Sequence, residues 1–553
     1  MVAKASVESK YNTKVLDHLG LVAGMCQELK ISEIIDEQLP NDSPDKILST
    51  GNAVVGLILN GLGFVNKRLY LVSKFFENKP VDKLLNVSYL NSEHFNDDAL
   101  GRALDAVYKY GASKLYSLIS SQAIRYLSDT YDLKLESGQL DNTNFHLHGS
   151  AKELVENAET ILKITRGHSK DGRPDLVQIG LQLIVENQSG IPLLMEVLSG
   201  NQEESKSYGE FIKKYTAQLD KDFDLNVIVA DSKLYNKNNL SLLGGEASLT
   251  WITRVPNALK VVKELLADLD AGALKPLEGY EKYKYQVVCS TYGEVNQRWI
   301  VLQSEDKHAQ DLKRLDKEFV KASQATAKAY KKLTKQLFAT EVEALVAADK
   351  FSKSLKFNTL ECVKTLPKNK YSRAGKPRKE QKPDRICYTI EGEIRVNQEQ
   401  YDAAKKKLGY FILATNEQDE QQINPSEVLA HYKNQSKVES SFRFLKDPKI
   451  VASSLFVQKP ERMVAIMMIM TLCLLVYAAL EYVTRTLLKQ ENLTFPNQVN
   501  KEVQNPTMRW IFESFEGIHI LYSTDNERIV LNLKEKHRRI IQLLGKNYLQ
   551  FYT

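Results

Sequence analysis

The sequence predicts an α/β protein whose sheet is flanked by helical segments, and three observations predict it. Apolar residues recur three and four apart over about the first 130 positions, short β-branched or apolar runs begin near 131, and helical spacing returns after about 426. The length of 553 residues exceeds what one hydrophobic core organises, so several domains are expected.

Residues 1–130 are predicted to form a helical N-terminal domain. The runs LDHLGLVAGMCQELKISEIIDEQL and NAVVGLILNGLGFVNKRLYLVSKFF both have helical spacing. Asn96 precedes a third run, DDALGRALDAVYKYG, and its side chain is expected to cap that helix. Leu100, Leu104 and Val107 would share the buried face of the helix.

Residues 131–256 are predicted to form strands around one helix. The runs LDNTNFHLHG, LVQIGLQLIVE, IPLLMEVLSGN, NVIVADS and SLTWITRVP are short and bounded by turn-forming residues. Between the third and the fourth lies KSYGEFIKKYTAQLD, which has helical spacing. An antiparallel start followed by a helix and a further strand predicts a mixed sheet.

Residues 257–425 have the pattern of an inserted domain, with strands and a long Lys-rich helical stretch at 311–338. Within it, residues 364–385 carry nine Lys or Arg against two acidic residues, a local charge of +7 in a chain whose net charge is +6. Pro, Gly and Ser predict a flexible loop there, either an arm that contacts DNA phosphates or a solvated linker.

Residues 426–553 are predicted to be helical to the end of the chain. They contain 18 mostly apolar residues at 463–480, a length at the lower edge for a membrane span. Thr471 and Tyr477 lie within this stretch and charged residues flank it closely. We therefore expect a helix buried in a large core.

Composition excludes several classes of protein. Hydrophobic residues make up 43% of the chain and charged residues 26%, values typical of soluble globular proteins and not of disordered ones. The five cysteines are scattered singly without zinc-site spacing, which favours a reducing, cytoplasmic compartment. The first residues lack the apolar core of a signal peptide, and no glycine-rich phosphate loop predicts a nucleotide cofactor.

The segment 432–448, YKNQSKVESSFRFLKDP, is predicted to be one helix with two faces. Val438, Phe442 and Leu445 form an apolar stripe, and Pro448 is expected to end the helix. Five polar residues fall within an arc of about 80° beside that stripe. They are Tyr432, Gln435, Glu439, Arg443 and Lys446. The helix can thus present a carboxylate among cations, although a solvated face with a Glu439–Arg443 pair gives the same pattern.

Two acidic residues near predicted strand ends are candidate partners of Glu439. Asp141 opens the run DNTNFHLHG, and Asp231 follows the buried run 227–230. Such carboxylates can converge with one from a packed helix, and hard oxygen ligands suit Mg²⁺. Without metal, like charges would hold them somewhat apart. Asp is also a common turn residue, so this pattern alone leaves a structural role open.

The residues around Glu439 resemble a known family. Tyr432, Gln435, Glu439 and Lys446 look like the Tyr-Arg-Glu-Lys signature of bacterial insertion-sequence DDE transposases of the IS-four superfamily, and the chain is most similar to its IS-sixteen-thirty-four branch. The likeness includes, in order, FNDDALGRALD, LDNTNFHLHG, GHSKDGRPDLVQ, VLSGNQEE, IVADSKLYN, WITRVP, KPERMVAIMMIMTLCLLVYAALE and PTMRWIF. It implies an RNase H-like (retroviral-integrase-like) catalytic core interrupted by the insertion domain.

The resemblance also implies a function. Asp141, Asp231 and Glu439 would be the catalytic triad that binds two Mg²⁺ ions, for which Mn²⁺ can substitute. Tyr432 and Lys446 would hold a phosphate near the cut element end. The enzyme would cleave double-stranded DNA at terminal inverted repeats and join 3′-hydroxyls to target DNA. It would act as a homodimer on DNA, associated with the bacterial nucleoid, with the N-terminal domain binding the element end.

Gln435 departs from the signature, because the wider superfamily has arginine there. An amide cannot hold phosphate through a charged two-pronged contact. Arg443, one helical turn beyond Glu439, is the residue we expect to supply the missing charge.

Other residues are weaker candidates for the site. His146 and His148 share one strand face, but that face is opposite to that of Asp141, which favours a structural role. The segment 167–178 is expected to be a turn network, with DNA contact as the alternative. Trp251 lies in an apolar strand and is expected in the core, although an aromatic residue could also stack on a displaced base.

Three other functions fit parts of the sequence. An inactive or domesticated DNA-binding protein would share the fold, but the intact Asp141, Asp231 and Glu439 argue against it. An RNase H-like nuclease without strand transfer would carry the same triad. A membrane-anchored protein rests only on residues 463–480.

Overall fold

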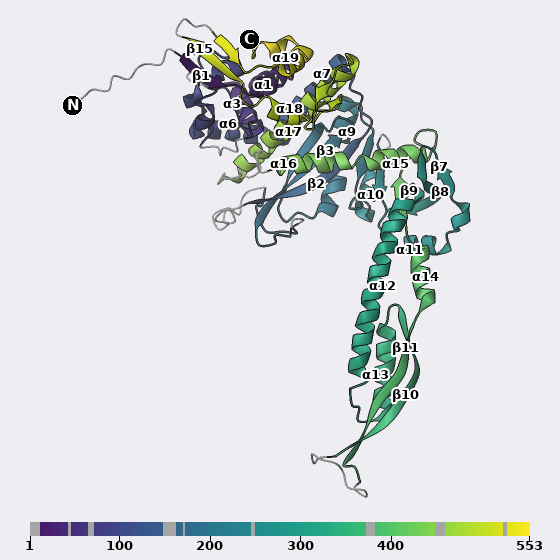
Figure 1. Ribbon diagram of the computed structural model, residues 1–553. Coiled ribbons are helices and arrows are strands. Elements are labelled where there is room, and N and C mark those ends of the chain that lie inside the picture. The colour runs from purple at the N-terminus through teal and green to yellow at the C-terminus, as the bar shows by residue number, and fades with distance from the viewer. Residues whose placement is uncertain are drawn as a thin grey trace, which may run out of the picture. The chain divides into compact units, whose positions relative to one another are not determined.

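The computed structural model describes residues 11–41, 46–64, 71–147, 162–169, 172–244, 249–371, 382–447, 459–523 and 528–553. The chain divides into two compact units (Figure 1). Unit 1 comprises Met1–Arg254, Ser290–Gln297 and Thr415–Thr553, and unit 2 comprises Val255–Cys289 and Arg298–Ala414.

Unit 1 begins with a short strand and a group of helices. The elements are β1 (Tyr11–Val15), α1 (Leu19–Glu28), α2 (Ile31–Gln38), α3 (Thr50–Leu62), α4 (Val72–Phe76), α5 (Val81–Leu85), η2 (Ser92–Phe95), α6 (Asp97–Tyr110) and α7 (Ala112–Tyr131). The Asn96 side chain accepts the Ala99 N–H at 3.0 Å, and Leu100, Leu104 and Val107 are completely buried. The predicted cap and buried face of α6 are therefore confirmed.

The strands that follow form the sheet of unit 1. They are β2 (Gly138–Leu147), β3 (Val177–Glu186), β4 (Pro192–Ser199), β5 (Val227–Ala230) and β6 (Thr250–Arg254), in the order β4-β3-β2-β5-β6. β2, β3 and β4 pair antiparallel, whereas β5 is parallel to both β2 and β6. Helices α9 (Glu204–Phe223) and α10 (Lys237–Leu243) connect the later strands. The predicted mixed sheet is confirmed.

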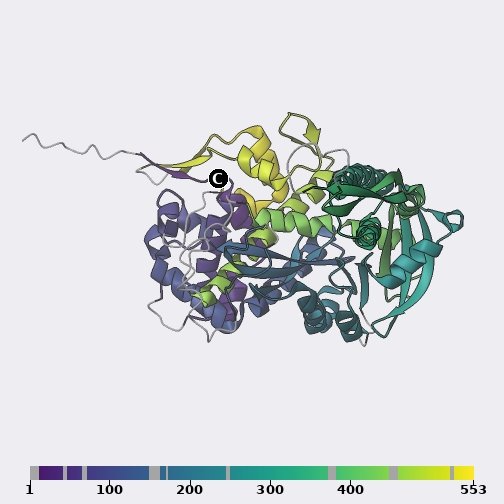
Figure 2. The same ribbon diagram turned by 90° about the horizontal axis from the view of Figure 1, so that it is seen from below.

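The C-terminal part of unit 1 contains helices and short strands. The helices are α15 (Pro425–Lys433), α16 (Ser436–Leu445), α17 (Pro460–Gln490), α18 (Met508–Ser514), α19 (Glu535–Leu544) and α20 (Lys546–Leu549). The strands are β13 (Phe495–Pro496), β14 (Glu502–Val503), β15 (His519–Ser523) and β16 (Arg528–Leu531). The expectation of helices alone was wrong, because β15 pairs with both β1 and β16. Strand β1 from the start of unit 1 therefore lies beside β15 from its C-terminal part (Figures 1 and 2).

Helix α17 contains the apolar stretch 463–480 and forms the centre of the helical core. It packs against α1, α3, α6 and α7. Within the described chain it is the one helix long and apolar enough to cross a membrane, and 89% of its most apolar window is buried inside the protein. The predicted buried core helix is confirmed, since apolar residues on all sides of α17 are covered by protein.

Unit 2 combines strands with an arm of helices and a hairpin. Its strands β7 (Lys275–Leu277), β8 (Tyr280–Tyr292), β9 (Val295–Ser304) and β12 (Tyr410–Thr415) lie in the order β12-β9-β8-β7. Its helices are α11 (Lys260–Asp268), η3 (Ala271–Ala273), α12 (Glu305–Leu333), α13 (Glu341–Ser354) and α14 (Gln398–Lys406). Strands β10 (Asn358–Lys370) and β11 (Arg385–Val396) form an antiparallel hairpin that packs on α13 (Figure 1).

The basic segment 364–385 is a loop only in part. Lys364–Lys370 belong to β10, and Arg385 begins β11 directly opposite Lys370. Residue 371 and residues 382–384 lie outside the strands, and residues 372–381 lie outside the described residues. Pairing with the β-branched run of β11 extends the strand through Pro367, which a two-stranded hairpin tolerates because each strand has an unpaired edge.

Candidate active site

In unit 1, three charged residues occupy corresponding positions on adjacent strands, directly after the last residues of the parallel pairing. Ala230, the last residue of β5, is opposite Leu140 of β2 on one side and Thr253 of β6 on the other. Neighbouring strands are separated by about 4.8 Å. The residues that directly follow these three positions are Asp141, Asp231 and Arg254.

Asp141 lies within β2, so the prediction that it marks a strand end was wrong. β2 continues to Leu147, which is opposite Val177 of β3. The parallel pairing with β5, however, stops at Leu140. Asp141 therefore occupies the point at which β2 loses one neighbour and the sheet opens, because its antiparallel partner is longer than its parallel one.

Tyr208 of α9 links Asp141 to Asp231. The Tyr208 ring is fully buried and its hydroxyl donates a hydrogen bond to Asp141 Oδ1 at 2.9 Å. The same oxygen accepts the Asn142 N–H at 2.7 Å. Burial raises the pKa of Tyr208, and the negative charges of Asp141 and Asp231 raise it further. The phenol therefore stays protonated and serves as a donor to the carboxylate.

Asp231 is fixed at the point where the chain leaves β5. Its Oδ1 accepts the Lys233 N–H at 3.0 Å, which is the hydrogen bond of an Asx turn. Its carbonyl oxygen accepts a hydrogen bond from Thr253 Oγ1 at 2.7 Å. The second bond ties the ends of β5 and β6 together, so the backbone that carries Asp231 is held from both sides.

Tyr432 lies within electrostatic reach of Asp231 and Glu439. Its hydroxyl is hydrogen-bonded to the guanidinium of Arg254. Burial raises the pKa of Tyr432, the Arg254 charge lowers it, and the Asp231 and Glu439 charges raise it. The Tyr432 phenol thus lies near Asp231 and Glu439, and the Tyr208 phenol lies near Asp141 and Asp231.

Helix packing explains how Tyr432 and Glu439 reach this edge. α15 packs on β5 and β6, whereas α16 packs on β2 and β3. Gln139 of β2 holds α15 in place, because its Nε2 donates to the His431 carbonyl oxygen at 3.1 Å. The junction of the two helices therefore passes over the strands that carry Asp141 and Asp231.

The segment 432–446 is two helices, so the prediction of a single helix was wrong. α15 ends at Lys433 and α16 begins at Ser436. Between them the Gln435 N–H bonds to the Tyr432 carbonyl oxygen at 3.2 Å, which is the tighter spacing of a 3₁₀ turn. Asn434 favours such a break, because its side chain competes for backbone hydrogen bonds.

The residues of α16 keep the two predicted faces. Val438, Phe442 and Leu445 are buried, which confirms the apolar stripe. Glu439 is exposed in the first turn, where the helix dipole stabilises a carboxylate. Arg443 is exposed in the last turn. Gln435 and Lys446 are half-buried at the two caps, and Pro448 lies outside the described residues.

The donor set fits a hard cation, but the three acids are not gathered into a finished metal site. Over the described ranges, no group of three or more His, Cys, Asp or Glu side chains is close enough to hold a metal ion. The charges of Asp141 and Asp231 both raise the pKa of Tyr208, and the charges of Asp231 and Glu439 both raise the pKa of Tyr432. Mutual repulsion keeps carboxylates apart until a cation is present.

Other predicted candidates have local contacts. His146 Nε2 lies 2.9 Å from Ser169 Oγ, and His148 is outside the described residues. Arg173 donates two hydrogen bonds to Asp175, at 2.9 and 2.8 Å, which makes a local turn network. Trp251 is completely buried, as expected for a core residue.

Sequence reasoning missed Tyr208 and Arg254. Tyr208 is in a helical run whose spacing shows only that the residue faces the core. Arg254 directly follows the buried stretch of β6, just as Asp231 follows β5. A charged residue at the end of an apolar strand is therefore the sequence signal for Arg254 as well as for Asp231. Sequence reasoning applied this signal only to Asp231.

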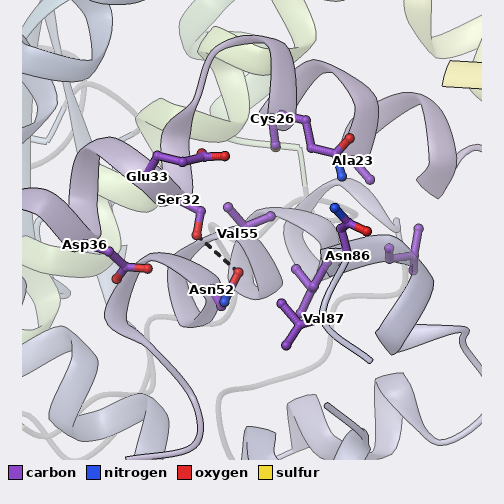
Figure 3. A pocket seen from close by; sticks show the side chains of 12 residues that line it. Ala23, Cys26, Ser32, Glu33, Asp36, Asn52, Val55, Asn86 and Val87 are labelled. Carbon is purple, nitrogen blue, oxygen red and sulfur yellow. Dashed lines mark hydrogen bonds between the residues drawn. The ribbon is translucent and has the colours of Figure 1, made fainter. Parts of the chain in front are cut away.

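A separate pocket lies among the N-terminal helices (Figure 3). It measures about 500 Å³, and Glu33 and Asp36 are among the residues that line it. Ser32 Oγ donates to Asn52 Oδ1 at 3.1 Å in its wall. Burial raises the pKa of the Cys26 thiol in this wall, so the thiol stays protonated. The pocket contains none of the predicted catalytic residues.

Comparison with known proteins finds a family model that matches only the N-terminal part of the chain. Residues 11–121 match a family described as Domain of unknown function (DUF4277). No curated protein matches the chain. A solved structure, a piggyBac transposase synaptic complex with hairpin DNA, is similar at 10% identity and a TM-score of 0.37, covering 92% of this chain and 82% of that one. A likeness at that level carries no weight for function, so the candidate site stands on its own residues.

Proposed function

We propose that the protein is a DDE-type DNA transposase with an RNase H-like catalytic core. It would cut DNA at the ends of its own element and join the freed 3′-hydroxyls to target DNA. The observation that carries the proposal is the level placement of Asp141 and Asp231 on neighbouring strands, with Glu439 on a helix packed over the same sheet. The motif resemblance and this placement select the same three acids.

The three acids would hold the metal. Asp141, Asp231 and Glu439 offer carboxylate oxygens, the ligands that Mg²⁺ and Mn²⁺ prefer. Two bound Mg²⁺ ions would stabilise the attacking and leaving oxygens of a phosphoryl displacement. Tyr208 keeps Asp141 oriented, since its hydroxyl is held protonated at 2.9 Å from the carboxylate.

The DNA end would lie along α16 and the junction before it. Tyr432, Gln435, Arg443 and Lys446 are the residues proposed to contact it. Lys446 at the C-terminal cap and the exposed Arg443 provide positive charge. Glu439 belongs to the same helix, so a phosphate held by the cations would be presented to the acids. A homodimer would hold both ends of the element.

The hairpin of unit 2 is proposed to contact the DNA backbone. Lys364, Lys368, Lys370 and Arg385 are exposed on it. Lys370 and Arg385 are opposite each other in register. Like charges in opposing positions repel, and a DNA phosphate would relieve that repulsion.

The test uses short duplexes taken from the DNA that flanks the gene, with an unrelated duplex as control. A transposase should bind the flanking duplex, nick it when Mg²⁺ is added, and join the 3′-hydroxyl to a target plasmid. Nicking without joined products would indicate the nuclease function instead. Binding without nicking would indicate an inactive DNA-binding protein.

A further inference from the structure

Helix α12, the long helix of unit 2, carries six exposed lysines on one side (Figure 1). They are Lys313, Lys317, Lys321, Lys328, Lys331 and Lys332, and we call them the lysine row. At about 100° per residue, the six fall within an arc of about 100°. At a rise of about 1.5 Å per residue, the lysine row is about 28 Å long.

The opposite side of α12 is packed against the rest of unit 2. Leu315, Thr326 and Leu333 are buried, and they point roughly 160° away from the middle of the lysine row. The Phe319 ring contacts the rings of Phe357 and Tyr401, with centroids 5.8 and 5.1 Å apart. This packing fixes the rotation of α12 about its axis, so the lysine row is held toward solvent.

The acidic residues beside the lysine row are engaged elsewhere. Between Lys313 and Lys332 the sequence contains two, Asp316 and Glu318, and neither falls within the arc of the lysines. Asp316 accepts a hydrogen bond from the Tyr401 hydroxyl at 2.5 Å, and Glu318 forms an ion pair with Lys356. Within the described ranges, no ion pair involves a lysine of the row.

A charged face of one sign is unlike an ordinary solvated face. Exposed helix faces commonly alternate charges of both signs, which attract one another three or four residues apart. Here the neighbours four apart are alike, as in Lys313, Lys317 and Lys321, and they repel. Duplex DNA has about one phosphate per 3.4 Å of each strand, so about eight phosphates of each strand match the length of the row.

We infer that the lysine row binds the phosphate backbone of duplex DNA, as a contact surface additional to the hairpin of unit 2. The choice of DNA as the polyanion rests on the proposed function. An ammonium is a compact charge on a flexible stem, and phosphate contacts carry no base information. The row therefore suits DNA of any sequence, as target DNA is. The alternative is a solvated face with no ligand.

The salt dependence of DNA binding separates these two roles. Full-length protein is bound to a flanking duplex and to an unrelated duplex over a series of salt concentrations. The row variant combines four substitutions, Lys313→Gln, Lys317→Gln, Lys321→Gln and Lys328→Gln. Each phosphate contact contributes about 0.9 to the slope of log affinity against log salt. The row variant should lower the slope by roughly 2 to 4 and weaken binding at low salt at least about tenfold, equally for both duplexes.

A control variant removes the same charge from other exposed positions of unit 2. It combines Lys263→Gln, Lys350→Gln, Lys405→Gln and Lys406→Gln. Its slope should stay close to that of the wild type, because these lysines lie outside the row. Equal loss of slope in the two variants would overturn the inference, since net charge alone would then explain the effect.

A second measurement uses the wild type alone, so it does not depend on the row variant folding. Lysines are acetylated with and without the unrelated duplex, and mass spectrometry measures the extent at each position. DNA should protect the lysine row, whereas Lys405 and Lys406 of α14 should be acetylated equally in both samples. Equal acetylation of the row with and without DNA would overturn the inference.

The remaining outcomes distinguish this inference from the proposed function. An unchanged slope in a folded row variant would overturn the inference and leave the proposed function intact. Tighter binding of an RNA duplex than of a DNA duplex would overturn the choice of DNA. Absence of nicking and joining by the wild type would overturn the proposed function, and a reduced slope in the row variant would still support DNA binding by the row.

Discussion

The Tyr208 hydroxyl donates a hydrogen bond to Asp141 Oδ1 at 2.9 Å, which joins helix α9 to strand β2 where the sheet opens. Tyr208 is completely buried, so this bond has no competition from water. The contact restrains a side chain that we propose as a metal ligand. Loss of a group that orients a metal ligand typically costs about ten- to a hundredfold in metal affinity or activity.

Tyr208→Phe should therefore reduce metal-dependent nicking by roughly ten- to a hundredfold. The ring still fills its site, so unfolding free energy should fall by only about 1 kcal/mol, the value of one hydrogen bond. Nicking at several Mg²⁺ concentrations and denaturant unfolding check the two parts. Phe211→Leu, a buried change on the same helix, controls for altered packing. Normal metal dependence in the Tyr208→Phe variant would show that the bond is only structural.

His18 should make stability fall in acid. Burial lowers its pKa from 6.5 to about 4, and its Nε2 donates to the Leu62 carbonyl oxygen at 2.8 Å. Between these two pKa values the unfolded chain binds a proton that the folded chain does not, so stability decreases as pH falls through this window. The loss should reach roughly 3 kcal/mol.

The measurement is unfolding free energy against pH for wild type and His18→Gln. The variant is less stable at neutral pH, since the imidazole stacks on Phe512 with ring centroids 4.3 Å apart. It should nevertheless show a flatter profile between the two pKa values, because the titrating group is gone. Parallel profiles would mean that His18 is not the residue responsible.

The residues proposed to hold the DNA end should differ in importance. Lys446→Ala should weaken binding of the end, with some nicking retained at high protein concentration. Arg443→Ala should weaken binding more than Gln435→Ala, because only the first removes a charge. Gel shifts measure binding and a separate assay measures nicking. Equal binding by Arg443→Ala and wild type would remove Arg443 from the site without affecting the catalytic assignment.

The hairpin of unit 2 should contribute binding but not chemistry. Replacing Lys364, Lys368, Lys370 and Arg385 with Gln should weaken DNA binding and flatten its salt dependence, because fewer counterions are released. Nicking of DNA already bound should change little. Gln replacement of exposed lysines on α14, Lys405 and Lys406, is the control. An unaltered salt slope would show that the hairpin is only a structural arm.

Local patterns in the sequence were enough to predict much of the fold. The Asn96 cap, the buried face of α6 and the apolar stripe of α16 depend on residues close together in the chain. Strands β3 to β6 and helix α9 also follow runs whose spacing is evident without knowledge of their neighbours. Such features are local, so periodicity and capping residues predict them.

Features that depend on pairing could not be predicted in the same way. Asp141 is at the sheet opening only because β5 is shorter than β3, and strand lengths on both sides of β2 are needed to know it. Arg254 lies beside Asp231 only because β5 and β6 are parallel and in that register. The break at Asn434 is a single tight turn between α15 and α16. Such a turn is too short to be detected from hydrophobic periodicity.

The most direct test of the central claim is Mg²⁺-dependent nicking of the flanking duplex by Glu439→Gln. This substitution keeps the size of the side chain and removes the charge that would hold the metal. We predict that nicking is lost while binding of the duplex persists, and that Asp141→Asn and Asp231→Asn behave alike. Glu210→Gln, the same change at an exposed position of α9, should nick as the wild type does. Full nicking by Glu439→Gln would contradict the assignment of this site as the catalytic centre.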